Sequence, residues 1–166
     1  MSLRILHASE CTRHLPELAE WHHREWAHLY LDWTLPTALA ELRSHQDANA
    51  IADTTWLALD EDTLLGSVSL LSEDAPALAH LDGPWLASLW VHPAHRRQGL
   101  GAHLVNHVRQ HARQHQLPRL RLFTVAGADW YHRLGWQADR TAVLNGSAVT
   151  IMHCAPGDDT QSTYPP

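Results

Sequence analysis

The sequence predicts an α/β (α+β) domain with a mixed, twisted central sheet and helices on both faces, and two observations support this. Short apolar runs of strand length alternate along the chain with segments whose apolar residues recur at helical spacing. Trp85–Val91 is almost continuously apolar, which is typical of a central strand covered on both faces. With 166 residues, 45% of them hydrophobic, the chain is long enough to bury the core of one such domain.

The N-terminal half is expected to contain a strand, two helices and a hairpin. Pro16 is tolerated in the first turn of the first helix, and Thr34 is a suitable N-cap for the second. The acidic turn 60–62 separates two apolar runs, which predicts the hairpin. In chain order, the expected elements are the strand 3–8, the helices 12–30 and 34–45, and the strands 54–59 and 65–71.

The C-terminal half is expected to complete a single domain over residues 1–154. Pro118 ends a long helix, and Asn145-Gly146 is a strong signal for a two-residue hairpin turn. Residues 155–166 are rich in Gly, Asp, Ser, Thr and Pro, which predicts a solvated, flexible tail. The expected elements are the strand Trp85–Val91, the helix 99–116, the strand 120–125, the short helix 129–134, and the strands 142–144 and 149–152.

Composition argues against several classes of protein. The net charge of −6 disfavours a general nucleic-acid binder, because phosphate backbones attract basic surfaces. No apolar run approaches the ~20 residues that span a bilayer, so no membrane partner is expected. Cys11 and Cys154 are too few for a disulfide framework, so a reducing, cytoplasmic location is expected. Whether the chain forms a homodimer stays open.

Directly after the central strand, the chain combines the features of an anion-binding turn. Pro93 ends the strand, the basic turn Arg96-Arg97-Gln98 follows, and Gly99-Leu100-Gly101-Ala102 stands at the start of a helical pattern. Glycines let the backbone approach a ligand, while the free N–H groups and the dipole of a helix start favour phosphate. The spacing fits neither the P-loop nor the dinucleotide fingerprint, which needs a third glycine where His103-Leu104 stand.

Three motifs resemble the GCN5-related N-acetyltransferase (GNAT) superfamily in sequence, order and separation. They are Arg96-x-x-Gly99-x-Gly101, the strand end Leu89-Trp90-Val91-His92-Pro93, and Trp130-Tyr131-His132-Arg133-Leu134-Gly135-Trp136. The resemblance covers residues 3–153 and implies the fold of that superfamily, whose central sheet splays apart at its middle. It also implies an acetyl-CoA-dependent N-acetyltransferase, in which a primary amine of a small molecule or peptide attacks the thioester directly. A non-catalytic acyl-CoA-binding module is the alternative.

For acetyl-CoA as cosubstrate, the resemblance implies two sets of contacts. Main-chain N–H groups of residues 97–102 bind the pyrophosphate, and Arg96 and Arg97 add positive charge. The pantetheine arm pairs with the backbone of residues 89–91, where the central strand separates from the strand 120–125. The cofactor-binding residues expected on this basis are Leu89, Trp90, Val91, Arg96, Arg97, Gln98, Gly99, Leu100, Gly101 and Ala102.

The resemblance also places Tyr131 where the family often keeps a general-acid tyrosine. A phenol with a pKa near ~10 is protonated at neutral pH, so it is a suitable proton donor to the leaving thiolate. A backbone N–H near residues 89–91 is expected to stabilise the oxyanion. The alternative role for Tyr131 is packing beside Trp130 and Trp136.

The general base is not assigned by the resemblance. Many family members carry a glutamate on the central strand about where Ala87 and Ser88 stand here, and a family asparagine is missing from residues 126–128. A replacement base acts directly or through water, or an amine that arrives partly neutral needs none. The candidates for this role are Glu25, Asp32, Glu73, Asp74, His80 and Asp82.

Acceptor specificity in this fold usually comes from the first two helices and the loop before the central strand. That region interleaves aromatic residues with carboxylates, and both attract an ammonium group. The alternative is that the tryptophans belong to the core and the acids to the solvated surface, and core packing is favoured for Trp26. The candidate acceptor-contacting residues are Glu25, Trp26, Tyr30, Trp33 and Ser88.

Four histidines recur at four-residue steps along the helix 99–116, which is a spacing that can chelate a metal. The row is expected to start near solvent at His103 and to end near the core edge at His115, because each step drifts by about 40°. No carboxylate or cysteine joins it, so surface histidines without a metal are expected.

Overall fold

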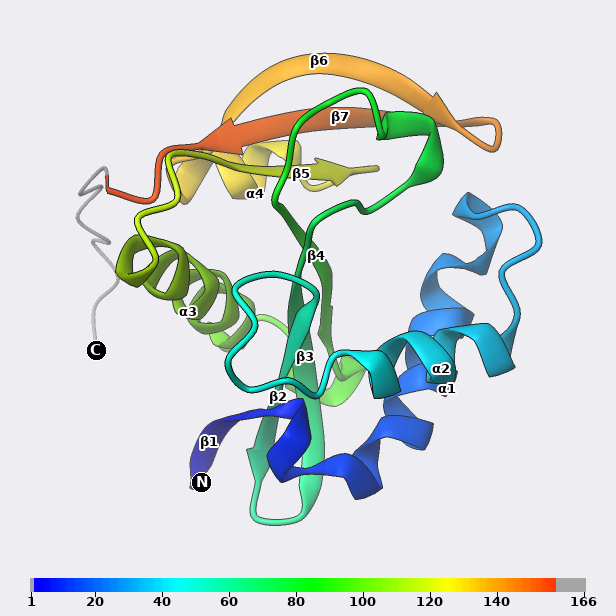
Figure 1. Ribbon diagram of the computed structural model, residues 1–166, viewed down its shortest axis with the longest axis vertical. Coiled ribbons are helices and arrows are strands. Elements are labelled where there is room, and N and C mark those ends of the chain that lie inside the picture. The colour runs from blue at the N-terminus through cyan, green and yellow to red at the C-terminus, as the bar shows by residue number, and fades with distance from the viewer. Residues whose placement is uncertain (1, 158–166) are drawn as a thin grey trace.

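The computed structural model describes residues 2–157, which form a seven-stranded mixed sheet with strand order β1-β2-β3-β4-β5-β7-β6 (Figure 1). All neighbouring strands pair antiparallel except β4 and β5, which are parallel. The strands are β1 (Leu3–His7), β2 (Thr54–Asp60), β3 (Thr63–Leu71), β4 (Trp85–Val91), β5 (Leu120–Thr124), β6 (Gln137–Leu144) and β7 (Ser147–Cys154). The predicted mixed α/β fold is therefore confirmed.

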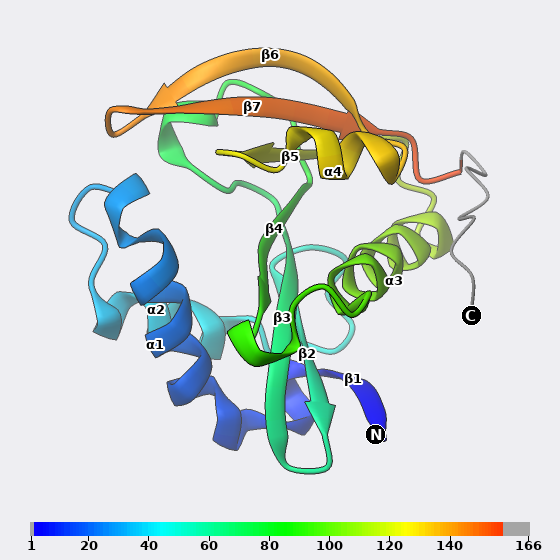
Figure 2. The same ribbon diagram turned by 180° about the vertical axis from the view of Figure 1, so that it is seen from behind.

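Helices cover both faces of the sheet, as predicted. The helices α1 (Leu15–Trp26) and α2 (Leu35–Ser44) lie on one side of β2–β4, and α3 (Leu100–Gln114) lies on the other (Figure 1). The view from behind shows the short helix α4 (Ala128–Arg133) beside β5 and β7 (Figure 2). Within residues 2–157, no helix is both long and apolar enough to cross a membrane.

The sheet opens into a wedge between its two parallel strands. Strand β4 pairs with β5 at one position only, where Trp85 at the start of β4 lies opposite Arg121. Beyond this point β4 stays with β3, whereas β5 continues along β7, so the two halves of the sheet diverge (Figure 1). The predicted splay is therefore present, and the edge of β4 that faces β5 is left without a strand partner over residues 86–91.

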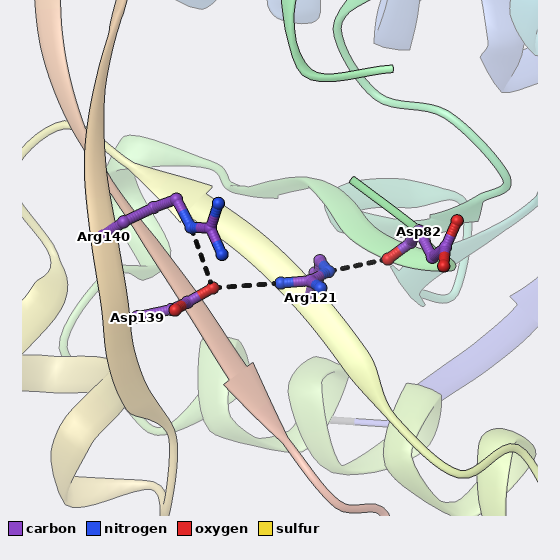
Figure 3. Close-up of polar contacts among 4 residues, drawn as sticks. All are labelled: Asp82, Arg121, Asp139 and Arg140. Atoms are coloured by element: carbon purple, nitrogen blue, oxygen red, sulfur yellow. Dashed lines mark hydrogen bonds and ion pairs between the residues drawn. The ribbon is translucent and has the colours of Figure 1, made fainter. Parts of the chain in front are cut away.

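The closed end of this wedge is held by the buried side chain of Arg121, which is 7% exposed (Figure 3). Its Nε donates to the carbonyl oxygen of Asp82 at 2.7 Å, and its Nη1 donates to Asp139 Oδ2 at 3.1 Å. The same carboxylate oxygen accepts from Arg140 Nε at 3.2 Å. A buried guanidinium is tolerated only when its donors are satisfied. Arg121 therefore joins the loop before β4 to β5 and β6.

Local signals in the sequence account for several element boundaries. Thr34 Oγ1 accepts from the backbone N–H of Thr37 at 3.2 Å, so the predicted N-cap of α2 is confirmed. Asn145 and Gly146 have φ values of 45° and 82°, as a two-residue turn between β6 and β7 requires. The amide Nδ2 of Asn145 also donates to the carbonyl of His28 at 2.9 Å, which ties this turn to the segment after α1.

Three predicted elements differ from the structure, and the first is β7, which spans Ser147–Cys154 rather than the expected 149–152. The single helix expected over 12–30 is divided, because α1 is flanked by short 3₁₀ turns at Thr12–His14 and Ala27–Leu29. Strand β6 has eight residues rather than the three expected, because most of its side chains are exposed and it lies at the sheet edge, where an apolar pattern is not needed. The expected tail lies outside the described residues from residue 158 onward.

Candidate functional site

A β-bulge in β4 shapes the wall of the wedge. Ser67 pairs with Trp90 and Ser69 pairs with Ala87, so two residues of β4 lie opposite one residue of β3. Within the bulge Ser88 has a φ of 52°, a left-handed conformation that is uncommon for residues other than glycine. A bulge re-aims the backbone groups of its strand. The residues after Ser88 therefore present backbone groups toward the open side of the wedge.

The bulge is supported from α1 by a chain of two hydrogen bonds. Ser67 Oγ donates to the carbonyl of Ser88 at 3.0 Å, and His22 Nε2 lies 2.8 Å from the same hydroxyl oxygen. Since Ser67 donates its hydroxyl proton to the Ser88 carbonyl, its oxygen can only accept from His22, so Nε2 of His22 carries the proton. Burial lowers the pKa of His22 to about 3, so the ring is neutral at neutral pH. His22 and Ser67 thus position the bulge.

The turn before α3 has the geometry of an anion site. Arg97 and Gly99 have φ values of 62° and 84°, and α3 begins at Leu100. The backbone N–H of His103 bonds to the carbonyl of Gly99 at 3.1 Å, so the amides before His103 precede the first helical bond and are available to a ligand. A Cβ added at Gly101 would lie 3.3 Å from Trp130, so this glycine lets α4 pack against the start of α3.

The two adjacent arginines of the turn differ in their contacts. Arg96 Nε donates to the carbonyl of Val91 at 2.8 Å, and its Nη2 pairs with Glu25 at 3.0 Å. Arg96 therefore connects the turn to α1 and already has an anionic partner. Arg97 is exposed, and within residues 2–157 it forms no ion pair, which leaves its charge available to a phosphate.

A cavity of about 900 Å³ lies in the wedge, bounded by β4, the end of β5, α4, and the segment that connects α1 to α2. Of the residues expected from sequence to contact the cosubstrate, Leu89 lines this cavity, while the turn before α3 lies outside it. Trp90 is buried against Trp21, with ring centroids 5.0 Å apart, so only its backbone is available. The residues singled out from the sequence that line the cavity are Glu25, Trp26, Tyr30, Asp32, Trp33, Asp74, Ser88, Leu89 and Tyr131.

Tyr131 is held in the cavity wall by aromatic packing. Its ring lies edge-on to Trp130 and Trp136, at centroid distances of 4.8 and 6.1 Å. Burial raises the pKa of Tyr131, so its hydroxyl is protonated at neutral pH. Within the described residues this hydroxyl has no hydrogen-bond partner, so its proton remains available to a ligand.

Asp74 is the cavity carboxyl with the most perturbed ionisation. Tyr30 donates its hydroxyl proton to Asp74 Oδ1 at 3.1 Å. Burial raises the pKa of Asp74 to about 7 against the effect of this hydrogen bond, and the charge of Glu41 contributes to the rise. A carboxyl with such a pKa both accepts and releases protons near neutral pH.

The other base candidates are less suitably placed. Glu25 and Asp32 line the cavity, but Glu25 is paired with Arg96 and Asp32 is exposed. Glu73, His80 and Asp82 do not line it. From the sequence alone, Asp74 is only one of six candidates, because it lies in a loop without periodicity and meets Tyr30 from 44 residues away. Glu41 also lines the cavity but belongs to no sequence motif, so the sequence does not indicate it.

The raised pKa of Asp74 predicts a pH-dependent cost to stability. Between about pH 4 and pH 7 the folded chain keeps a proton on Asp74 that the unfolded chain releases. The binding of this proton stabilises the folded state at low pH, and this stabilisation is lost as the pH rises through the folded pKa. We expect Asp74→Asn to leave the melting temperature nearly unchanged below about pH 4, and to raise it by an amount that grows as the pH rises to about 7 and reaches several degrees near pH ~8.

The measurement is the melting temperature of both proteins across this pH range. Because the two proteins share every histidine, the difference between their curves isolates Asp74. A difference that does not change with pH would contradict the assigned pKa.

The histidine row on α3 packs differently from the expectation. His107 and His111 lie edge-on to Trp56 of β2 at 5.1 and 4.8 Å, and burial lowers the pKa of both. The expected drift toward the core at His115 is wrong, because Trp56 covers the middle of α3 and leaves His103 and His115 exposed. Within residues 2–157 no group of three or more His, Cys, Asp or Glu side chains is placed to hold a metal ion.

Comparisons with known proteins agree on one family. The profile of the Acetyltransferase (GNAT) family matches residues 15–136. A protein from Desulfovibrio desulfuricans assigned to the GNAT family is 17% identical, with 94% of this chain and 100% of that chain covered and a TM-score of 0.72. An aminoglycoside 6′-N-acetyltransferase complexed with coenzyme A is 15% identical, with coverage of 94% and 97% and a TM-score of 0.70.

A spermidine N-acetyltransferase from Vibrio cholerae is 14% identical, with coverage of 93% and 94% and a TM-score of 0.65. A search of curated proteins finds no match. At these identities the solved structures establish the similarity of fold.

Proposed function

Since the chain belongs to the acetyltransferase (GNAT) family, with acetyl-CoA as cosubstrate, we propose that it transfers the acetyl group to a primary amine bound in the wedge cavity. The observation that carries this proposal is that Tyr131 and Asp74 line one cavity beside the unpaired edge of β4. A proton donor and a carboxyl that titrates near neutrality can act as the general acid and the general base of amine acetylation.

The residues present fit the cosubstrate at two places. The backbone N–H groups of residues 97–102 at the start of α3 suit the pyrophosphate, and Arg97 adds an available positive charge. The edge of β4 over residues 89–91 has no strand partner on the side of β5, so an extended pantetheine arm can pair with it as an added strand. Together these contacts bring the thioester to the bulge at Ser88.

The chemistry follows from the groups in the cavity. The amine passes a proton to Asp74, directly or through water, and its nitrogen then attacks the thioester carbonyl. A backbone N–H just beyond the bulge stabilises the oxyanion that forms. As the carbon–nitrogen bond is completed and the carbon–sulfur bond breaks, the nitrogen releases its remaining extra proton to water and the hydroxyl of Tyr131 protonates the leaving thiolate. The proton on Asp74 returns to solvent and Tyr131 is reprotonated from it.

The alternative is a module that binds acyl-CoA without catalysis. It is motivated by Ala87 and Ser88, which stand where many relatives carry a glutamate. The position of Asp74 argues against it, because this carboxyl reaches the same cavity from the loop before β4. We therefore favour the enzyme.

A direct test measures thiol release from acetyl-CoA by the purified chain, with a panel of aliphatic amines, amino sugars and short peptides. The chain contains no lysine, so self-acetylation on lysine cannot contribute to the signal. With an accepted amine, kcat/KM should rise with an apparent pKa near 7, and Asp74→Asn should remove this rise and most of the rate. Binding of acetyl-CoA without acetylation of any amine would support the module instead.

A further inference from the structure

The acceptor side of the cavity holds two carboxyl groups, each hydrogen-bonded to an aromatic side chain. Tyr30 donates to Asp74 Oδ1 at 3.1 Å, and Trp33 Nε1 donates to Glu41 Oε2 at 3.1 Å. The rings of Tyr30 and Trp33 are in contact, with centroids 5.4 Å apart. Asp74, Tyr30, Trp33 and Glu41 thus form a continuous series, which we call the acidic–aromatic strip.

The strip runs from the interior of the cavity to its rim. Asp74 is half-buried in the cavity wall, whereas Glu41 on α2 is exposed. Phe123 of β5 extends the aromatic surface, with its ring centroid 6.5 Å from that of Tyr30. A ligand that extends from Asp74 to the rim therefore passes along ring faces and ends beside a second carboxyl group.

The charge of the strip is not balanced by the protein. Neither Asp74 nor Glu41 forms an ion pair within residues 2–157. The described residues that line the cavity include further acids at Glu25 and Asp32 but no arginine, and His28 is their one basic side chain. The charge of Glu41 raises the pKa of Asp74, which shows that the two carboxyls interact unfavourably when both are ionised.

We propose that the acceptor is a small molecule with at least two ammonium groups, which places its reacting amine at Asp74 and a second ammonium against Glu41 and Trp33. This inference rests on the proposed function and narrows its substrate class. A cation at each end of the strip relieves the repulsion between the carboxylates. The intervening rings add cation–π attraction or cover the apolar part of the ligand. A monoamine of equal length leaves Glu41 without a cationic partner.

The test compares kcat/KM for matched acceptors with acetyl-CoA: α,ω-diamines, amino alcohols of the same chain length, and plain monoamines. Removing the distal ammonium removes its attraction to Glu41 and to the Trp33 ring, so diamines should be preferred by roughly 10-fold. Amino sugars are measured in parallel, because they carry several ammonium groups on compact rings. Their kcat/KM values show whether the cavity prefers such rings or linear diamines.

The variant Glu41→Gln removes the charge and retains an oxygen that can accept from Trp33 Nε1. It should reduce the diamine-to-monoamine ratio of kcat/KM to about one, mainly through KM. The matched control is Glu20→Gln, which removes an exposed acid from α1 outside the cavity and should leave the ratio as in the wild type.

The outcomes separate the two levels of the proposal. Equal rates for diamines and monoamines in the wild type, or a ratio that survives Glu41→Gln, would overturn the dication inference while the acetyltransferase stands. Acetylation of none of these compounds would overturn the dication inference, and acetylation of no short peptide either, with acetyl-CoA still bound, would overturn the proposed function itself.

Discussion

Replacing Tyr131 with phenylalanine is expected to lower the turnover number by about 10²–10⁴-fold and to leave the affinity for acetyl-CoA nearly unchanged. The phenol is held by Trp130 and Trp136, and phenylalanine retains these ring contacts. What is lost is one proton donor, in a cavity where burial keeps that donor protonated. Loss of a group that acts only in the transition state lowers kcat and kcat/KM together.

The measurement pairs steady-state kinetics with calorimetric titration of acetyl-CoA, and thermal denaturation checks that the fold is retained. Comparison of acetyl-CoA with an activated thioester, whose leaving group is the thiolate of a more acidic thiol, adds a second readout. The variant should lose less rate with the better leaving group, because that group needs less help from a proton. Wild-type turnover in the variant would exclude the hydroxyl from the mechanism.

The second large effect is expected at the start of α3, where Gly101→Glu should abolish the thermal stabilisation by acetyl-CoA. In the wild type, ligand at 100 times its Kd should stabilise the fold by about 2.7 kcal/mol. A carboxylate at position 101 repels the pyrophosphate and blocks the close approach of the backbone. A loss of affinity of about 100-fold or more is expected, since two charge-assisted hydrogen bonds contribute about 3 kcal/mol or more.

Packing at Gly101 requires controls for this variant. A Cβ there lies 3.3 Å from the Trp130 ring, so Trp130 must shift even in Gly101→Ala. Comparing Gly101→Ala with Gly101→Glu separates the packing change from the charge. Gln98→Glu adds the same charge at an exposed position of the turn and should weaken acetyl-CoA binding without changing the melting temperature of the free protein. Unchanged affinity in both glutamate variants would contradict the assigned pyrophosphate site.

The sequence predicted those features that depend on neighbouring residues. The turn from Pro93 to Gly101, the cap at Thr34 and the hairpin at Asn145 each follow from local conformational preferences, and the structure has all three. The splay of the sheet came from the family resemblance. The sequence indicates only residues 142–144 of β6, because an exposed edge strand needs no alternation of apolar and polar residues.

The candidate site was predictable only in part, because its chemistry depends on contacts between distant segments. Nothing near Asp74 in the chain indicates that Tyr30 would donate to it or that Glu41 would raise its pKa. The pairing of Arg96 with Glu25 likewise joins residues 71 positions apart, so a phosphate role for both arginines of the turn was the natural expectation. The fold supplies these contacts.

The joint at Arg121 makes the wedge sensitive to small rotations. Because β4 and β5 pair only beside this residue, the two halves of the sheet are connected through one short contact, about which they can rotate relative to each other. Leu89 lies four residues from Trp85, about 13 Å along the strand, so a rotation of about 4° moves it by ~1 Å. Misplacement on this scale can cost an enzyme about 100-fold in rate. In the proposed reaction, the alignment of thioester and amine therefore depends on a guanidinium outside the residues that line the cavity.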